Sequence, residues 1–142
     1  MLKRTMTTVD FNGVTRVEDF YFNLTESEVL EMEMGTSGGY QQMITNIINS
    51  KDVPSLVHIF KTLVLKAYGE KSLDGKYFNK TDIHGNPLSI PFSQTQAYSD
   101  LFMELATDDK AASEFVNGIM PNTVKAKLDT LETKDLTMVE KT

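Results

Sequence analysis

The sequence contains no cysteine and no long apolar run. Without cysteine there is no disulfide framework, no thiolate zinc site and no thiol nucleophile. No apolar segment approaches the roughly 20 residues that a transmembrane helix needs. The first ten residues, MLKRTMTTVD, also lack the apolar core of a signal peptide. We therefore expect a protein that works in a cytosol.

Positive charge is scarce as well. Lysine and arginine together number 14 against 20 aspartates and glutamates, so the formal net charge is −6. Nucleic-acid binding needs a basic footprint, and docking on an anionic membrane surface needs clustered basic residues. The charge balance therefore predicts neither a nucleic-acid nor a membrane partner.

The rest of the composition is that of an ordinary globular protein, with 40% hydrophobic and 24% charged residues in 142. Residues 52–69 form the central element, because their apolar residues recur at helical spacing. Asp52 is suited to cap this helix and Gly69 to end it. The apolar stripe consists of Val53, Leu56, Val57, Phe60, Leu63, Val64, Ala67 and Tyr68.

The N-terminal segment, residues 3–22, predicts a β-hairpin because strand-forming residues flank Asn12-Gly13. Two registers are open at this stage. A two-residue turn would pair Phe11 with Val14, whereas a three-residue loop with a bulge would pair Asp10 with Val14.

Helices are expected over most of the remaining chain. Thr25 and Glu28 form a capping box that starts one, and Gly35 ends it. Further helices are expected over residues 40–48, from Ser93 to residue 106, from about 109 to 120, and briefly within 122–131. Residues 70–92 are irregular, with a short hairpin expected around Asp74-Gly75 or His84-Gly85.

These elements predict an α+β fold that is mostly α. An N-terminal β-hairpin (residues 1–24) packs on a bundle of about five helices (residues 25–131), giving a single globular domain over 1–131. Residues 132–142 have few apolar anchors and are expected to form a flexible C-terminal tail.

Few residues suggest chemistry. Asp74, Asp82 and His84 are candidate metal ligands, but their spacing matches no established site, and such loop residues commonly form solvated turns. His58 has no visible Ser or Asp partner. Residues 35–39 are glycine-rich but lack the Lys-Ser/Thr of a phosphate-binding loop. We therefore predict no catalytic residue, no cofactor and no metal, and a protein that is not an enzyme.

The eight methionines suggest a binding surface instead. Methionine adapts to varied apolar partners, so Met32, Met34 and Met103 are candidate partner-binding residues. The alternative, which we prefer for most of these methionines, is that they fill the core. Met103 is the strongest exception, because it lies off the apolar stripe of its helix.

Two blocks of sequence carry a family resemblance. The first spans residues 10–39, and the second joins KAYGEKSLDGKYF to FSQTQAYSDLFMELATDDKAASEFVNGIMP, which ends at Pro121. This arrangement resembles the short tail assembly chaperones encoded by long-tailed phages and prophages of Gram-positive bacteria. The segment 81–91 departs from the family pattern by being longer and richer in turns.

The resemblance implies that the protein binds and solubilises the tape measure protein during tail morphogenesis, with the tail-tube protein as a second partner. It also implies a location in the cytoplasm of the infected host and absence from the mature virion. Self-association of the chain is compatible with this role. Two alternatives stay open. One is a structural virion protein of the tail tube or head–tail joint, and the other is a small acidic inhibitor of a host defence protein.

Overall fold

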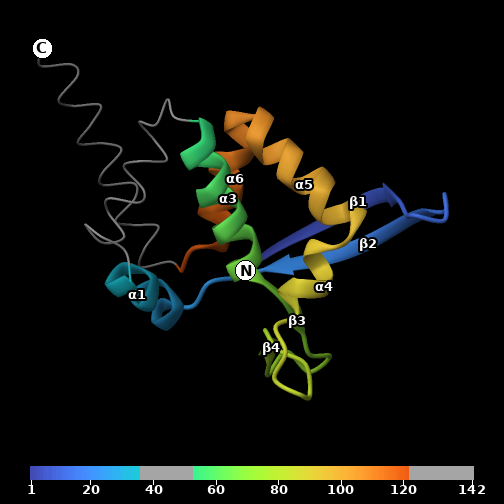
Figure 1. The fold of residues 1–142 in the computed structure, drawn as a ribbon. Coiled ribbons are helices and arrows are strands. Elements are labelled where there is room, and N and C mark those ends of the chain that lie inside the picture. Colours follow the sequence, from blue (N-terminus) through green and yellow to red (C-terminus); the bar gives the residue numbers. More distant parts are fainter. Residues whose placement is uncertain (36–52, 122–142) are drawn as a thin grey trace, which may run out of the picture.

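The computed structural model describes residues 1–35 and 53–121, with side chains for 1–32 and 57–121. Four strands and five helices occur in this part of the chain (Figure 1). In order they are β1 (Leu2–Val9), β2 (Thr15–Phe22), α1 (Glu26–Gly35), α3 (Val53–Ala67), β3 (Tyr68–Lys71), β4 (Phe78–Asn79), α4 (Ser89–Ser93), α5 (Gln96–Thr107) and α6 (Asp109–Ile119).

The N-terminal hairpin is confirmed, and its register is the second of the two alternatives. β1 and β2 are antiparallel from Leu2 opposite Phe22 to Val9 opposite Thr15. The Asp10 amide donates to the Val14 carbonyl at 2.9 Å, which leaves a three-residue loop between them. Gly13 has a φ of 78°, the left-handed conformation that such a loop requires.

The hairpin belongs to a larger sheet, which corrects the predicted fold. The sheet has four antiparallel strands in the order β1-β2-β3-β4. β3 joins β2 through Tyr21 opposite Gly69, so the expected helix over 52–69 ends at Ala67 instead. The Tyr68 ring stacks on Phe92 with centroids 4.0 Å apart. This contact, together with strand pairing, outweighs the helical periodicity that includes Tyr68 in the sequence.

The expected arrangement, an N-terminal hairpin packed on a bundle of about five helices, is also wrong, although the α+β class holds. In the described residues, α5 and α6 both contact β1, and Figure 1 shows α3, α5 and α6 gathered on one side of the hairpin. Phe22 of β2 lies in the core, with ring centroids 5.9, 5.8 and 5.3 Å from those of Tyr68, Phe92 and Phe115. The helices therefore pack on the sheet, and the hairpin supplies part of the core itself.

Helix starts follow local signals closely. The Thr25 amide donates to Glu28 Oε1 at 3.0 Å and the Glu28 amide to Thr25 Oγ1 at 3.3 Å, which confirms the capping box. Asp108 Oδ1 accepts the first amides of α6. The start predicted at Ser93 is wrong, because Ser93 ends α4 and Thr95 caps α5.

The helix expected over 40–48, the short helix within 122–131 and the tail 132–142 all lie outside the described residues. Within the described residues, no helix combines the length and apolar character needed to cross a bilayer.

Candidate partner-binding surface

The three methionines predicted from the sequence lie in different environments. Met32 is only 6% exposed and belongs to the core cluster, as the core-filling alternative proposes. Met103 is 55% exposed on α5. Met34 belongs to α1 by its backbone, and its side chain lies outside the described residues. Partner binding by these residues stays a prediction, for which Met103 is the accessible candidate.

The most exposed large apolar residues of the described chain lie at turns, and none of them was predicted as a partner-binding residue. Phe11 is 79% exposed, Ile83 is 94% exposed, and Leu73 is fully exposed. Each is the second residue of a turn, after Asp10, Asp82 and Ser72 respectively, and each turn contains a glycine with positive φ. The signal was present in the sequence as an apolar residue inside a turn motif.

Two of these turns are built alike. Asp10 Oδ1 accepts the amides of Asn12 and Val14, both at 2.9 Å. Asp82 Oδ1 accepts the amides of residues 84 and 86 at 2.8 and 2.9 Å. Because the carboxylate holds the loop backbone inward, the side chain next to it, Phe11 or Ile83, is left facing solvent.

Hydrogen bonds and charge hold these carboxylates ionised. The Arg16 side chain donates to Asp10 Oδ2 at 2.7 Å and is the main cause of the lowered pKa of Asp10. The pKa of Asp82 is lowered chiefly by the Asn86 amide. The turns are therefore fixed by ionised carboxylates at neutral pH.

The third turn, residues 72–77, also depends on an aspartate. Asp74 Oδ1 accepts the Ser72 hydroxyl at 2.7 Å and the Lys76 amide at 3.0 Å, and the Ser72 hydrogen bond is the first cause of its lowered pKa. Asp74 and Asp82 are thus turn formers, which was the alternative to metal ligation. No group of three or more potential metal ligands forms in the described part of the chain.

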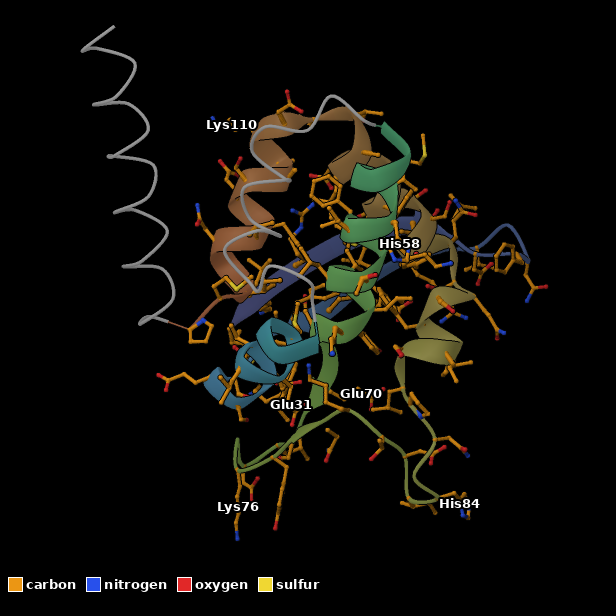
Figure 2. The ribbon with its side chains drawn as sticks, turned by 60° about the vertical axis from the view of Figure 1, so that its left-hand side comes forward. Glu31, His58, Glu70, Lys76, His84 and Lys110 are labelled. Atoms are coloured by element: carbon orange, nitrogen blue, oxygen red, sulfur yellow. The ribbon has the colours of Figure 1, made fainter. Side chains whose placement is uncertain are left out.

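The two histidines lie far apart in the fold. Figure 2 shows His58 on α3 in the body of the molecule and His84 at its lower end, in the loop after β4. The His58 side chain is exposed. The structure does not bring His58 and His84 together into one site.

The turns 72–77 and 81–87, here called the paired turns, extend from the same end of the molecule, where Lys76 and His84 are labelled (Figure 2). They flank β4 along the chain, and Thr81 and Pro87 form a β-bridge that closes the second turn. The turn at residues 10–14 lies at the far end of the hairpin instead (Figure 1). Phe11 therefore lies apart from Leu73 and Ile83, which belong to the paired turns.

Lys80 anchors the paired turns to the body of the protein. Its ammonium donates to the carbonyls of Lys66 at 2.6 Å and Asn23 at 2.9 Å, and lies 3.2 Å from Glu28 Oε2. Burial lowers the pKa of Lys80, and the neighbouring Glu28 opposes that shift. This one side chain joins β4 to the end of α3, the end of β2 and the start of α1.

This arrangement presents exposed apolar side chains on turns that hydrogen bonds to Asp10, Asp74 and Asp82 hold in place. A model of a protein family described as phage tail assembly chaperone matches residues 1–141. No curated protein and no solved structure matches the chain. Since the family model spans the hairpin, the helices and the paired turns alike, the chain belongs to the phage tail assembly chaperone family.

Proposed function

We propose that this tail assembly chaperone binds the tape measure protein and keeps it soluble while the tail is built. The observation that carries this proposal is the exposure of Leu73 and Ile83 on the paired turns of a family member. The resemblance described above implies a partner that is long, apolar and prone to form coiled coils. Apolar side chains held at fixed positions suit the apolar stripe of such a helix.

The energetics are compatible with reversible binding. Full burial of one Leu or Ile side chain contributes about 1.5–3 kcal/mol. The turns are already fixed by Asp74 and Asp82, so little additional ordering is required on binding. A few such contacts give a complex that can dissociate when the tail tube displaces the chaperone.

The net charge of −6 supports the same role. A net charge far from zero keeps a protein soluble. When the chaperone binds the tape measure protein, its negative charge adds to the net charge of the complex. In this proposal the protein is a non-enzymatic adaptor that also binds tail-tube subunits. It acts in the cytoplasm of the infected cell, and its host is a Gram-positive bacterium, as the resemblance implies.

Co-expression with the tape measure protein tests the proposal. The wild-type chain is expected to raise the soluble fraction of the tape measure protein and to co-purify with it. The double variant Leu73→Ser/Ile83→Ser is expected to lose most of this effect. Leu30→Ser is a matched control, because Leu30 is an exposed leucine that belongs to α1 and not to either of the paired turns. Met103→Ser tests the predicted contribution of α5 separately.

Two results would contradict the proposal. The first is a tape measure protein whose solubility does not depend on co-expression of the wild-type chain. The second is a double variant as effective as wild type, which would move the binding surface away from the paired turns. Circular dichroism of each variant distinguishes lost binding from lost folding.

A further inference from the structure

The strand β2 has an edge that nothing covers in the described part of the chain. β3 pairs with β2 only at Tyr21 and Phe22 and then turns away toward β4 (Figure 1). Residues 15–19 of β2 are all exposed, and Val17 is 68% exposed. An unpaired strand edge presents a row of backbone donors and acceptors that can pair with another strand.

The direction of these backbone groups follows from the hydrogen bonds around them. The Val14 carbonyl accepts from Asp10 and therefore points toward β1, whereas the Asn23 amide donates to Ala67 on the other side. Backbone groups alternate in direction along an antiparallel strand. The N–H and C=O groups of Thr15, Val17 and Asp19 therefore point away from β1, at the open edge.

We propose that two copies of this chain pair along this edge, antiparallel and about a two-fold axis at Val17. In this register Val17 lies opposite the partner's Val17, and Thr15 lies opposite the partner's Asp19. All three edge residues then exchange backbone hydrogen bonds with the second copy. The exposed Val17 side chain gains an apolar neighbour on the same face of the joined sheet.

The charges of Arg16 and Glu18 indicate that the strand that pairs with the open edge of β2 belongs to a second copy of this chain. The axis at Val17 places Arg16 opposite the partner's Glu18, and Glu18 opposite the partner's Arg16, so both cross-strand pairs attract. The neighbouring registers that keep the backbone groups paired would place Arg16 against Arg16 or Glu18 against Glu18. The strand is therefore complementary to itself in one register and repulsive in the adjacent two.

The Arg16 side chain can serve both contacts. Its Nε donates to Asp10 within the chain, which leaves the terminal guanidinium nitrogens for a second carboxylate. Glu18 is exposed, and it already contributes to the raised pKa of Arg16 within one chain. The pairing extends the sheet across the axis along residues 15–19, and Tyr21, which already pairs with Gly69, lies beyond it.

Sedimentation equilibrium of the full chain tests the proposal by charge exchange. Wild type is expected to dimerise with rising concentration. Arg16→Glu and Glu18→Arg each place like charges opposite one another, so each is expected to raise the dimer Kd about tenfold or more. Glu114→Arg makes the same charge change as Glu18→Arg, but on an exposed residue of α6. It is expected to leave the dimer Kd unchanged.

Two measurements in which dimerisation should be restored are decisive. A mixture of the Arg16→Glu and Glu18→Arg proteins restores attraction at both cross-strand pairs, so it is expected to form a heterodimer. The double variant Arg16→Glu/Glu18→Arg is expected to form a homodimer again. A wild type that stays monomeric at every concentration reached would overturn the proposal. A dimer that neither charge reversal weakens would also overturn it, because its interface must then lie elsewhere.

Discussion

At the scale of single residues, Lys80 shows what the sequence alone does not reveal. It looks like a surface lysine in a turn-rich segment, yet its ammonium contacts the carbonyl of Asn23, 57 positions away. Local sequence patterns cannot predict such a contact, because it forms only when distant parts of the chain come together in the fold. Thr25 and Glu28 were predictable for the opposite reason, since their hydrogen bonds span three positions.

Replacing Lys80 is expected to destabilise the fold. Lys80→Met keeps much of the aliphatic length but removes two hydrogen bonds to carbonyls and the contact with Glu28. Hydrogen bonds that involve a charged group contribute about 1.5–3 kcal/mol each, and Lys80 remains partly solvated, so we expect a loss of about 2 kcal/mol. Urea denaturation followed by circular dichroism measures this change in the free energy of unfolding.

Lys76→Met is the matched control for that experiment. Lys76 is exposed at the tip of a turn, and its ammonium lies over the Tyr77 ring with 5.4 Å to the centroid. Exposed substitutions of this kind change stability by at most about 0.5 kcal/mol. Equal stabilities of the two variants would show that the Lys80 contacts contribute nothing in solution.

At the scale of elements, signals confined to a few residues predicted the hairpin, α1, α6 and most of α3. The turn signal at Asp74-Gly75 also predicted the short hairpin that β3 and β4 form, but not that this hairpin joins β1 and β2 in one sheet. β3 starts at Tyr68, directly after α3, where an aromatic residue and a glycine continue the helical pattern and resemble its end. β4 contains two residues, too few for any periodicity. The pairing of β3 with β2 depends on a partner that the local sequence does not specify.

Gly69 makes the contact between β3 and β4 possible. A Cβ atom placed there would lie 2.6 Å from the Phe78 ring and 2.9 Å from the Asn79 carbonyl oxygen. Because the second neighbour is backbone, it cannot move aside cheaply. Gly69→Ala is therefore expected to lower the free energy of unfolding by about 2 kcal/mol, as for other overpacked sites.

Gly118→Ala provides the comparison within the same protein. A Cβ at Gly118 would lie 3.0 Å from the Leu2 side chain, which is flexible, and alanine favours the helix by about 0.5–1 kcal/mol. We expect its thermal midpoint to stay close to wild type while that of Gly69→Ala falls. A Gly69→Ala protein as stable as Gly118→Ala would contradict this account of β3.

At the scale of the whole molecule, composition limited the possible functions, and similarity along the entire chain supplied the family. No single motif could do so, since the described surface has turns and exposed apolar side chains in place of a chemical signature. The exposed apolar residues were the least predictable part of the surface. The sequence predicted partner-binding methionines on helices. It did not predict exposure of Phe11, Leu73 and Ile83, because each lies within a turn motif.

If the protein is an assembly factor, it should be absent from the finished particle. Mass spectrometry of purified virions is expected to detect tail-tube and tape measure proteins without this chain, while lysates of infected cells contain it. Depletion relative to the tail-tube protein is the quantity to measure. A stoichiometric copy number in purified tails would favour the structural alternative instead.

The contact between the first strand and the last described helix has a consequence during synthesis. Leu2 of β1 packs against Gly118 of α6, and Arg4 forms an ion pair with Glu104 of α5. Ribosomes add about 5–20 residues per second, so roughly 5–20 seconds separate the emergence of β1 from that of its covering helices. Until α6 emerges, Leu2 lacks the helix that packs against it, so we expect the nascent hairpin to need the factors that protect emerging chains in its host.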